Sequence, residues 1–338
     1  METRKVQITG GSTYMITLPK KWAQQVGLEA GAKVRMLPLQ NRAMVLQPES
    51  PDGTQQKVGT YNLEDEDGAP LTRSVISLYI AGYEVIQIQG GQITSSQRST
   101  IRRTTQSLIG PEIVEESSNQ VVIRNLSDLS ELSINETLSR IHQIARSMFE
   151  DAIKALIEKN DELAVDVGDR DDDVDRLFLA ISRRFRVMLY DILAEDAEEI
   201  TRVEYYDYQT AAKQLERIAD HSKKIANIVP KLKTELADEL AEVIEEAATK
   251  AVAVTDQALK SLKDRDIDLA NEALSKPEAV EDKLLELSKL NRELAPQTSQ
   301  LIGIVADSID RVKEYGINIA ETSLNSSYPL PSESAAEF

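Results

Sequence analysis

The sequence of 338 residues contains no cysteine and only two histidines. Without cysteine, the chain cannot form disulfides or thiolate metal sites, which fits a reducing cytoplasm. No apolar run approaches the ~20 residues that a membrane span needs, and no apolar segment follows the charged first residues. We therefore expect a cytoplasmic protein without membrane insertion or a signal peptide.

Residue sets typical of catalysis are also missing. No Ser/His/Asp set suggests itself, and no GxxxxGK[ST] phosphate loop occurs. His221 follows Asp220 but points about 100° round a helix from it, so we expect neither His221 nor His142 to be a ligand. The single tryptophan, Trp22, is expected in the core of a small domain. The sequence predicts a protein that is not an enzyme, although a metal-dependent phosphatase built on carboxylates is an alternative.

The net charge of −18 is unevenly distributed. Residues 1–50 carry seven Lys and Arg against three Asp and Glu, whereas residues 133–338 carry 26 against 43. A basic head could approach a polyanion that the acidic body would repel, which indicates two classes of partner. The acid-rich surface also suits a high-salt cytoplasm.

Residues 1–50 are predicted to form short strands around one brief helix. Val6 and Ile8 alternate with polar residues before a Gly10-Gly11 turn, and Pro19 suits the first turn of a helix that Gly27 ends. A hairpin is expected about Gln40-Asn41-Arg42. Fifty such residues bury too little surface to be stable alone, so we expect dimerisation.

Residues 51–132 are predicted to be an α+β connecting domain, after a linker over 48–59. Helices are expected over 71–81 and 95–109, and strands over 83–88, 112–116 and 120–124. Residues 324–338 are rich in Ser and Pro and are expected to be a flexible tail. The fold class is multidomain α+β, with a helical bundle from residue 133 to residue 323.

The helical region contains an internal repeat. Residues 155–164 match 261–270, and Leu215 to Asp220 matches Ile309 to Glu314. Val174-Asp175 matches Glu281-Asp282 if the offset increases by one residue. Residues 133–230 and 231–323 are therefore predicted to be two three-helix units that pack as a six-helix bundle.

Each copy carries two pairs of acidic residues spaced four apart. This spacing puts both carboxylates on one helix face, where several oxygens can share a cation. Solvated helix faces give many such pairs, but two pairs at matched positions in both copies point to metal binding, with a duplicated acidic surface as the alternative. The candidate metal ligands are Asp171, Asp175, Glu216, Asp220, Glu278, Asp282, Asp310 and Glu314.

The helical region resembles the PhoU family in three features. These are the acid-x-x-x-Asp pattern, the later Leu215 to His221 segment and the tandem copying. The resemblance covers about residues 135–323 and implies a six-helix bundle, usually dimeric, that restrains phosphate uptake. It also implies carboxylate-bound metal ions, here iron, zinc or magnesium. Two departures leave their number and identity open, because Asp171 stands where Glu often leads and Asp310/Glu314 reverse the usual order.

Residues 1–50 resemble the AbrB/SpoVT family, which forms a swapped-hairpin dimer that binds DNA. The residues that carry the resemblance are Arg4-Lys5-Val6, Ile16 to Pro19 and Gly27-Leu28. Ala23-Gln24 stand where that family has a basic pair, and Lys20-Lys21 follow Pro19 instead. The candidate DNA-binding residues are Arg4, Lys5, Lys20, Lys21, Arg35 and Arg42.

Together the two halves look like archaeal PhoU-related regulators with an AbrB-like head. They imply a homodimeric, DNA-binding regulator of phosphate uptake and phosphate homeostasis with a metal-binding sensory bundle. The alternative is an adaptor whose head only dimerises and whose helices restrain a phosphate ABC transporter ATPase or a sensor kinase by contact.

Overall fold

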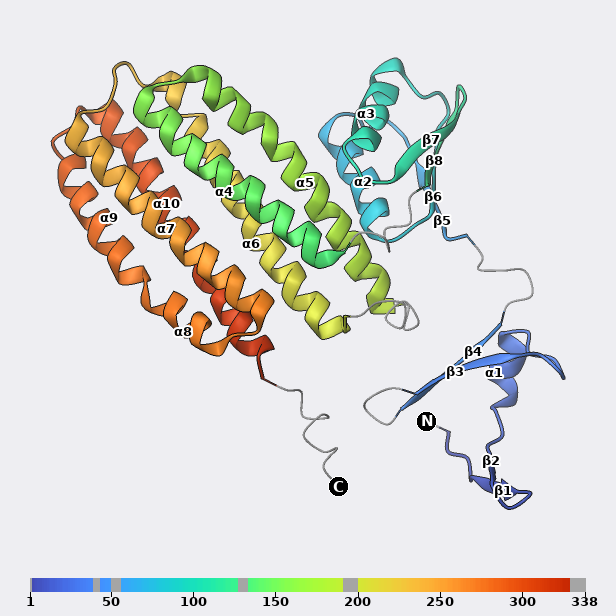
Figure 1. The fold of residues 1–338 in the computed structure, drawn as a ribbon. Helices are drawn as coiled ribbons and strands as arrows, with labels where there is room; N and C mark the ends of the chain where they lie inside the picture. The colour runs from blue at the N-terminus through green and yellow to red at the C-terminus, as the bar shows by residue number, and fades with distance from the viewer. Residues whose placement is uncertain (1, 39–42, 50–55, 127–132, 191–199, 329–338) are drawn as a thin grey trace. The chain divides into compact units, whose positions relative to one another are not determined.

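The computed structural model describes residues 2–38, 43–49, 56–126, 133–190 and 200–328. The chain divides into two compact units, one containing the N-terminal residues up to Gln55 and the other comprising Gln56–Pro329. The second unit contains a middle α/β domain and a helical bundle (Figure 1). Among the described residues, no helix is long and apolar enough to cross a membrane.

The N-terminal unit, which we call the head, contains two antiparallel hairpins and one short helix. Gly10 and Gly11 have positive φ angles of 63° and 83°, which the tight turn of the first hairpin requires. The strands of the expected second hairpin pair as predicted, and its turn at residues 40–42 lies outside the described residues. The elements are β1 (Gln7–Thr9), β2 (Thr13–Met15), α1 (Lys20–Gln25), β3 (Val34–Pro38) and β4 (Met44–Pro48).

The described part of the head contains no buried residue. Its apolar side chains are instead open to solvent, with exposed fractions of 75% for Tyr14, 66% for Met36 and 63% for Ile8. Exposed apolar area of this kind contributes nothing to folding until another surface covers it. Within a single chain, the described residues of the head therefore form no core.

The middle domain is a four-stranded sheet with both helices on one face (Figure 1). The strand order is β5-β6-β8-β7, with β5 parallel to β6 and the other pairs antiparallel. Leu71 and Val75 of the first helix pack on Ile88 and Ile123 of the sheet. The elements are β5 (Val58–Asn62), α2 (Ala69–Ile80), β6 (Val85–Gln89), α3 (Ser95–Gln106), β7 (Pro111–Glu116) and β8 (Gln120–Asn125).

Strand β5 begins inside the segment that was predicted to be a linker. Gly59 in its middle has the Tyr83 ring against it, so an added Cβ would lie 2.8 Å from the ring. Glycine normally weakens a strand, but it is required where another group approaches this closely. Since β5 pairs in parallel with a strand beyond α2, no local hairpin pattern revealed it.

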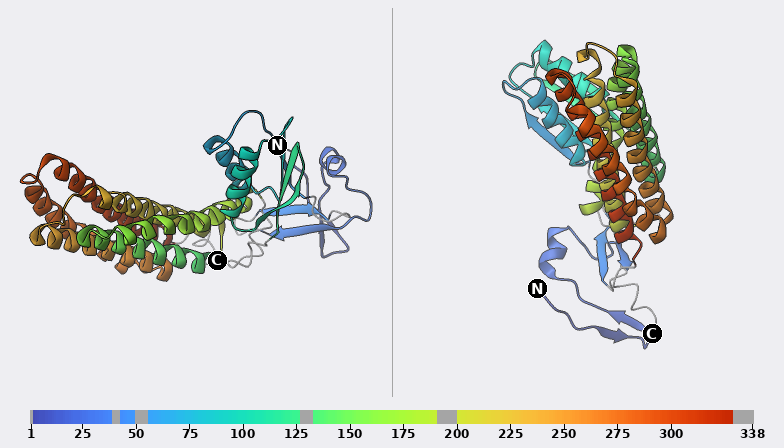
Figure 2. Two further views of the ribbon diagram at one scale, coloured as in Figure 1. Left: turned by 90° about the horizontal axis from the view of Figure 1, so that it is seen from above. Right: turned by 90° about the vertical axis from the view of Figure 1, so that its left-hand side faces the viewer.

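The bundle consists of long helices that run alongside one another (Figures 1 and 2). Its apolar core extends through both predicted repeats. The first repeat contains α4 (Ile134–Glu158), α5 (Asp161–Tyr190) and α6 (Arg202–Ala226), followed by the 3-10 turn η3 (Val229–Lys231). The second contains α7 (Asp238–Asp264), α8 (Ile267–Ser275), α9 (Pro277–Asn291) and α10 (Pro296–Ser326).

Side-chain caps mark where several of these helices begin. The Ser133 hydroxyl accepts a hydrogen bond from the Glu136 amide at the start of α4. Thr201 and Glu204 form a reciprocal capping box at the start of α6. Such caps satisfy amides that have no partner within the helix and contribute ~1 kcal/mol each.

The repeat is visible in the backbone as well as in the sequence. The first helices of the two copies end at Lys159 and Arg265, which have left-handed φ angles of 48° and 52°. These two positions differ by 106 residues, as do the buried pairs Leu138/Ile244 and Val174/Val280. In the second copy the middle helix is split at Pro277, which cannot donate the amide hydrogen bond that would continue α8.

Burial corrects one detail of the predicted alignment. Val174 and Val280 are both fully buried, so the offset of 106 continues through the middle helix instead of increasing by one. Asp175 then corresponds to Glu281 rather than to Asp282. The sequence comparison erred because Asp175 and Asp282 are identical in type, whereas packing is decided by the buried valines Val174 and Val280.

The middle domain and the bundle meet through the C-terminal part of α5. Arg183 is buried, and its guanidinium donates to the Tyr79 carbonyl oxygen and lies 4.9 Å from the centre of the Tyr79 ring. Lys57 lies 4.6 Å from the Tyr190 ring centre. Gly82 has Val187 and Tyr190 against it, with no room for a Cβ. The sheet domain is thus joined to the first repeat by specific polar and steric contacts.

Candidate functional site

The predicted DNA-binding residues of the head are exposed where the structure describes them. Arg4 pairs with Glu2 at 3.0 Å and Arg35 with Glu49 at 3.5 Å, so part of their charge is already balanced. Arg42 lies outside the described residues.

Lys20 and Lys21 occupy the first turn of α1, and both are exposed. They place two adjacent positive charges at the surface. Trp22 and Ala23, which follow them, are half-buried. The side chains that follow are thus partly covered, while the lysines remain accessible. This arrangement suits contacts to phosphate groups, which position a protein on a polyanion without reading its sequence.

The first repeat brings its two acidic pairs together. Asp171 and Asp175 of α5 face Glu216 and Asp220 of α6, and we call these four residues the first cluster. Two lysines from α6 compensate part of this charge. The Lys223 Nζ lies 2.7 Å from Asp171 Oδ2, and the Lys213 Nζ lies 2.7 Å from Glu216 Oε2.

Asp175 is the least compensated member of the first cluster. Burial, followed by the charges of Asp171, Glu216 and Asp220, raises its pKa to about 7. Burial and the nearby Glu216 and Asp171 carboxylates also raise the pKa of Asp220. Within the described residues, neither Lys213 nor Lys223 bonds Asp175. Additional positive charge at this point would therefore be favourable.

The acidic residues of the second repeat surround a buried lysine. The Lys313 side chain is 4% exposed, and its Nζ lies 2.9 Å from Asp310 Oδ1, 2.9 Å from Glu314 Oε1 and 3.2 Å from Glu281 Oε1. We call these four residues the second cluster. Burial lowers the pKa of Lys313, but hydrogen bonds to Asp310, Glu314 and Glu281 outweigh that effect and raise it above the ordinary value.

Two of the predicted ligands lie apart from this arrangement. Glu278 and Asp282 of α9 are exposed, and the acid of α9 that reaches α10 is Glu281. The prediction missed both Glu281 and Lys313. A signal for Lys313 was present in the alignment of the two repeats, where Lys313 corresponds to Ala219. Ala219 is buried, and a lysine occupies a buried position only when it has partners for its charge.

The residues that the structure describes contain no group of three or more acidic or histidine side chains placed to hold a metal ion. In the first cluster, an ion would have to displace the lysine bonds of Asp171 and Glu216. In the second cluster, the Lys313 ammonium occupies the centre. The first cluster would therefore take a metal ion only after Lys213 and Lys223 move away, and metal binding stays a prediction.

The two histidines serve the packing of the bundle. His221 lies against Tyr315, with 5.7 Å between ring centres, and these residues occupy matched positions in α6 and α10. Its Nδ1 is buried without a partner, and burial lowers its pKa. His142 of α4 bonds Asp256 of α7 at 2.8 Å. Both histidines thus connect the first repeat to the second.

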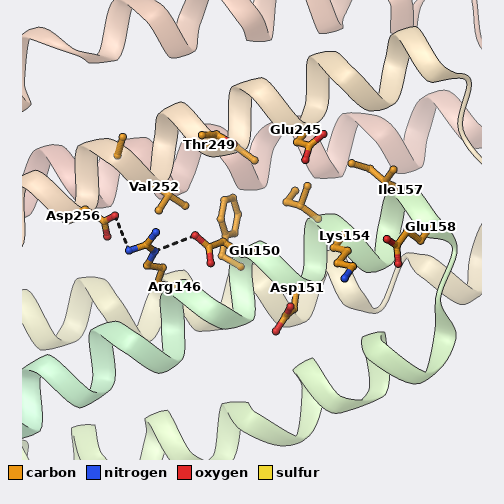
Figure 3. A pocket seen from close by; sticks show the side chains of 14 residues that line it. Arg146, Glu150, Asp151, Lys154, Ile157, Glu158, Glu245, Thr249, Val252 and Asp256 are labelled. Carbon is orange, nitrogen blue, oxygen red and sulfur yellow. Dashed lines mark hydrogen bonds and ion pairs between the residues drawn. The ribbon is translucent and has the colours of Figure 1, made fainter.

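An open groove of about 580 Å³ lies between α4 and α7. Figure 3 shows Arg146 of α4 reaching both Asp256 of α7 and Glu150 of its own helix, at 3.2 Å and 3.0 Å. The other charged side chains along the groove are Asp151, Lys154, Glu158 and Glu245, so acidic residues outnumber basic ones. The Arg146–Asp256 ion pair joins the two repeats across this acidic groove.

Two protein families match separate parts of this chain. The PhoU domain matches residues 138–229, and the family described as "Antidote-toxin recognition MazE, bacterial antitoxin" matches residues 7–54. A phosphate-specific transport system accessory protein PhoU homolog of Clostridium acetobutylicum is 23% identical over 208 residues, which cover 59% of this chain and 91% of that protein.

Two crystal structures of PhoU are also similar to this chain. The protein from Streptococcus pneumoniae is 17% identical with a TM-score of 0.48, and the match covers 58% of this chain and 95% of that one. The protein from Pseudomonas aeruginosa is 18% identical with a TM-score of 0.48, over 56% and 93% of the two chains. These matches give the chain a PhoU domain at residues 138–229 of its helical bundle and a MazE/AbrB-like antitoxin domain at residues 7–54, in its head.

Proposed function

We propose that this chain is a cytoplasmic regulator of phosphate uptake that binds DNA through its head as a homodimer. The observation that carries the proposal is the presence of both domains in one chain, together with the similarity to an accessory protein of phosphate-specific transport. The bundle would receive the phosphate signal, and the head would convert it into a change in transcription. The protein acts by binding rather than by catalysis.

The head supports this proposal through its exposed positive charge and its uncovered apolar side chains. Lys20 and Lys21 are exposed side by side, and the apolar residues Ile8, Tyr14 and Met36 need a covering surface. A second head would cover them and would bring two lysine pairs to one DNA duplex. Pairing of identical heads matches a recognition site with two-fold symmetry.

The first cluster is the part of the bundle that would take a cation. Its candidate ligands are all carboxylate oxygens, which suit a hard ion such as magnesium. Asp175 supports the assignment because it is half-buried among acids and its pKa is raised. A bound cation would supply the missing positive charge, while Lys213 and Lys223 would move out to solvent.

The test is DNA binding by the full-length protein to the region upstream of its own gene, with and without inorganic phosphate. We expect sequence-specific binding that phosphate alters and that Lys20→Ala/Lys21→Ala weakens at least tenfold. The matched control is Lys231→Ala/Lys233→Ala, which removes two exposed lysines from the bundle. Specific binding that survives the head variant unchanged would contradict the proposed role of these lysines.

A second function is favoured by the words "antidote-toxin recognition" in the description of the family that matches the head. The head would then serve only for dimerisation or protein contact, and the helices would restrain a phosphate ABC transporter ATPase or a sensor kinase. An intact dimer without specific DNA binding, combined with binding of the bundle to such a partner, would establish the adaptor and overturn the transcriptional proposal.

A further inference from the structure

The two acidic clusters differ in how firmly their lysines are held. Lys313 is 4% exposed and meets three carboxylates, whereas Lys223 and Lys213 are 42% and 37% exposed and each bonds a single residue of the cluster. A lysine ammonium has three N–H donors, so Lys313 is fully satisfied by Asp310, Glu314 and Glu281. Lys213 bonds the two oxygens of Glu216 and lies over the Phe178 ring, and Lys223 bonds one oxygen of Asp171.

The difference follows from one position in the repeat. Lys313 corresponds to Ala219, which is fully buried in the third helix of the first repeat. From this position the Lys313 side chain reaches the cluster from inside the bundle. In the first repeat the lysines approach from the solvent side and can swing away. The first cluster therefore has exchangeable counter-charges, and the second has a fixed one.

We propose that Lys313 is a permanent internal counter-ion that takes the place of a metal ion in the second repeat, so that any divalent cation held by the clusters is held by the first repeat alone. A divalent ion among Asp310, Glu314 and Glu281 would lie within a few ångströms of a buried ammonium and would be repelled by it. The restriction to the first repeat rests on the cation site proposed above, whereas the role of Lys313 does not.

Lys313→Met tests the counter-ion directly, because methionine fills a similar volume without charge. We expect the variant to unfold at a temperature lower by on the order of 5 °C in the absence of divalent ions, since three carboxylates would repel one another. Lys313→Arg and Lys313→Met/Glu281→Gln should each recover part of the loss. A Lys313→Met protein that unfolds with the wild type would overturn the proposal.

Mn²⁺ binding, followed by the paramagnetic signal of the free ion, tests the restriction to one repeat. We expect Asp175→Asn to abolish wild-type binding and Glu281→Gln/Asp310→Asn to leave it unchanged. Lys313→Met should gain a second binding site that also raises its unfolding temperature. Loss of wild-type Mn²⁺ through Glu281→Gln/Asp310→Asn would overturn the inference. If the wild type binds no Mn²⁺, the proposed cation site of the first repeat fails, and the unfolding experiment still decides the role of Lys313.

Discussion

Asp207, near the start of α6, is a buried acid whose protonation is linked to the stability of the bundle. It is 9% exposed, and burial raises its pKa to about 6. Between the ordinary aspartate pKa near 4 and the raised value, the folded chain keeps a proton that the unfolded chain releases. Stability contributed by this group therefore falls as pH rises through that window and stays low above it.

We predict that Asp207→Asn stabilises the protein at pH 7.5 and not at pH 4. The gain should be on the order of 1–3 kcal/mol, because asparagine removes the cost of ionising a buried carboxyl. Urea unfolding of the bundle at both pH values measures it. The control is Glu242→Gln, an exposed acid on α7, which should leave the difference near zero. An equal gain at both pH values would show that packing, not ionisation, is responsible.

At the scale of elements, the junction of α2 with α5 holds the middle domain on the bundle. We predict that Gly82→Ala and Arg183→Ala both loosen it. An alanine Cβ at position 82 would lie 2.5 Å from Tyr190 Oη and 2.9 Å from Val187 Cγ2. Loss of Arg183 removes its buried hydrogen bond to Tyr79, at a cost of about 1–3 kcal/mol.

Hydrogen exchange of the α2 and α5 termini measures this loosening. Gly68→Ala is the matched control, since Gly68 also has a positive φ of 57° but nothing within 4 Å of an added Cβ. Both glycine variants carry backbone strain, and only Gly82→Ala adds the clash. Equal exchange in the two glycine variants would mean that strain alone acts and that the junction is not tight.

The elements also show what a sequence can and cannot predict. Helical periodicity predicted the long helices, and the end of α8 before Pro277 has a local cause, because proline cannot continue a helix. Strand β5 was missed because its partner lies across a helix. The first cluster was anticipated from matched spacing alone. The second cluster was not, since the burial of Lys313 and the register of Glu281 depend on contacts between helices.

At the scale of the whole molecule, the exposed apolar side chains of the head need a partner surface to cover them. We predict that the full-length protein is a dimer in solution and that Ile8→Asp/Met36→Asp dissociates it, because charges would replace apolar side chains that the partner covers. Light scattering after gel filtration measures the mass. Leu285→Asp changes an apolar residue on the bundle that is 59% exposed, and it should leave the dimer intact. Dissociation by Leu285→Asp alone would move the interface to the bundle.

The charge asymmetry of the molecule makes the salt dependence of DNA binding the most informative measurement of the head. Each phosphate contact steepens the fall of log affinity with log salt by about 0.9. Two lysines from each of two heads would account for at most four contacts, so Lys20→Ala/Lys21→Ala should reduce the slope by up to about 3.6. Lys231→Ala/Lys233→Ala should leave the slope unchanged, although it makes the acidic body more repulsive. A weaker affinity with an unchanged slope would mean that Lys20 and Lys21 support the fold of the head instead of touching the phosphates.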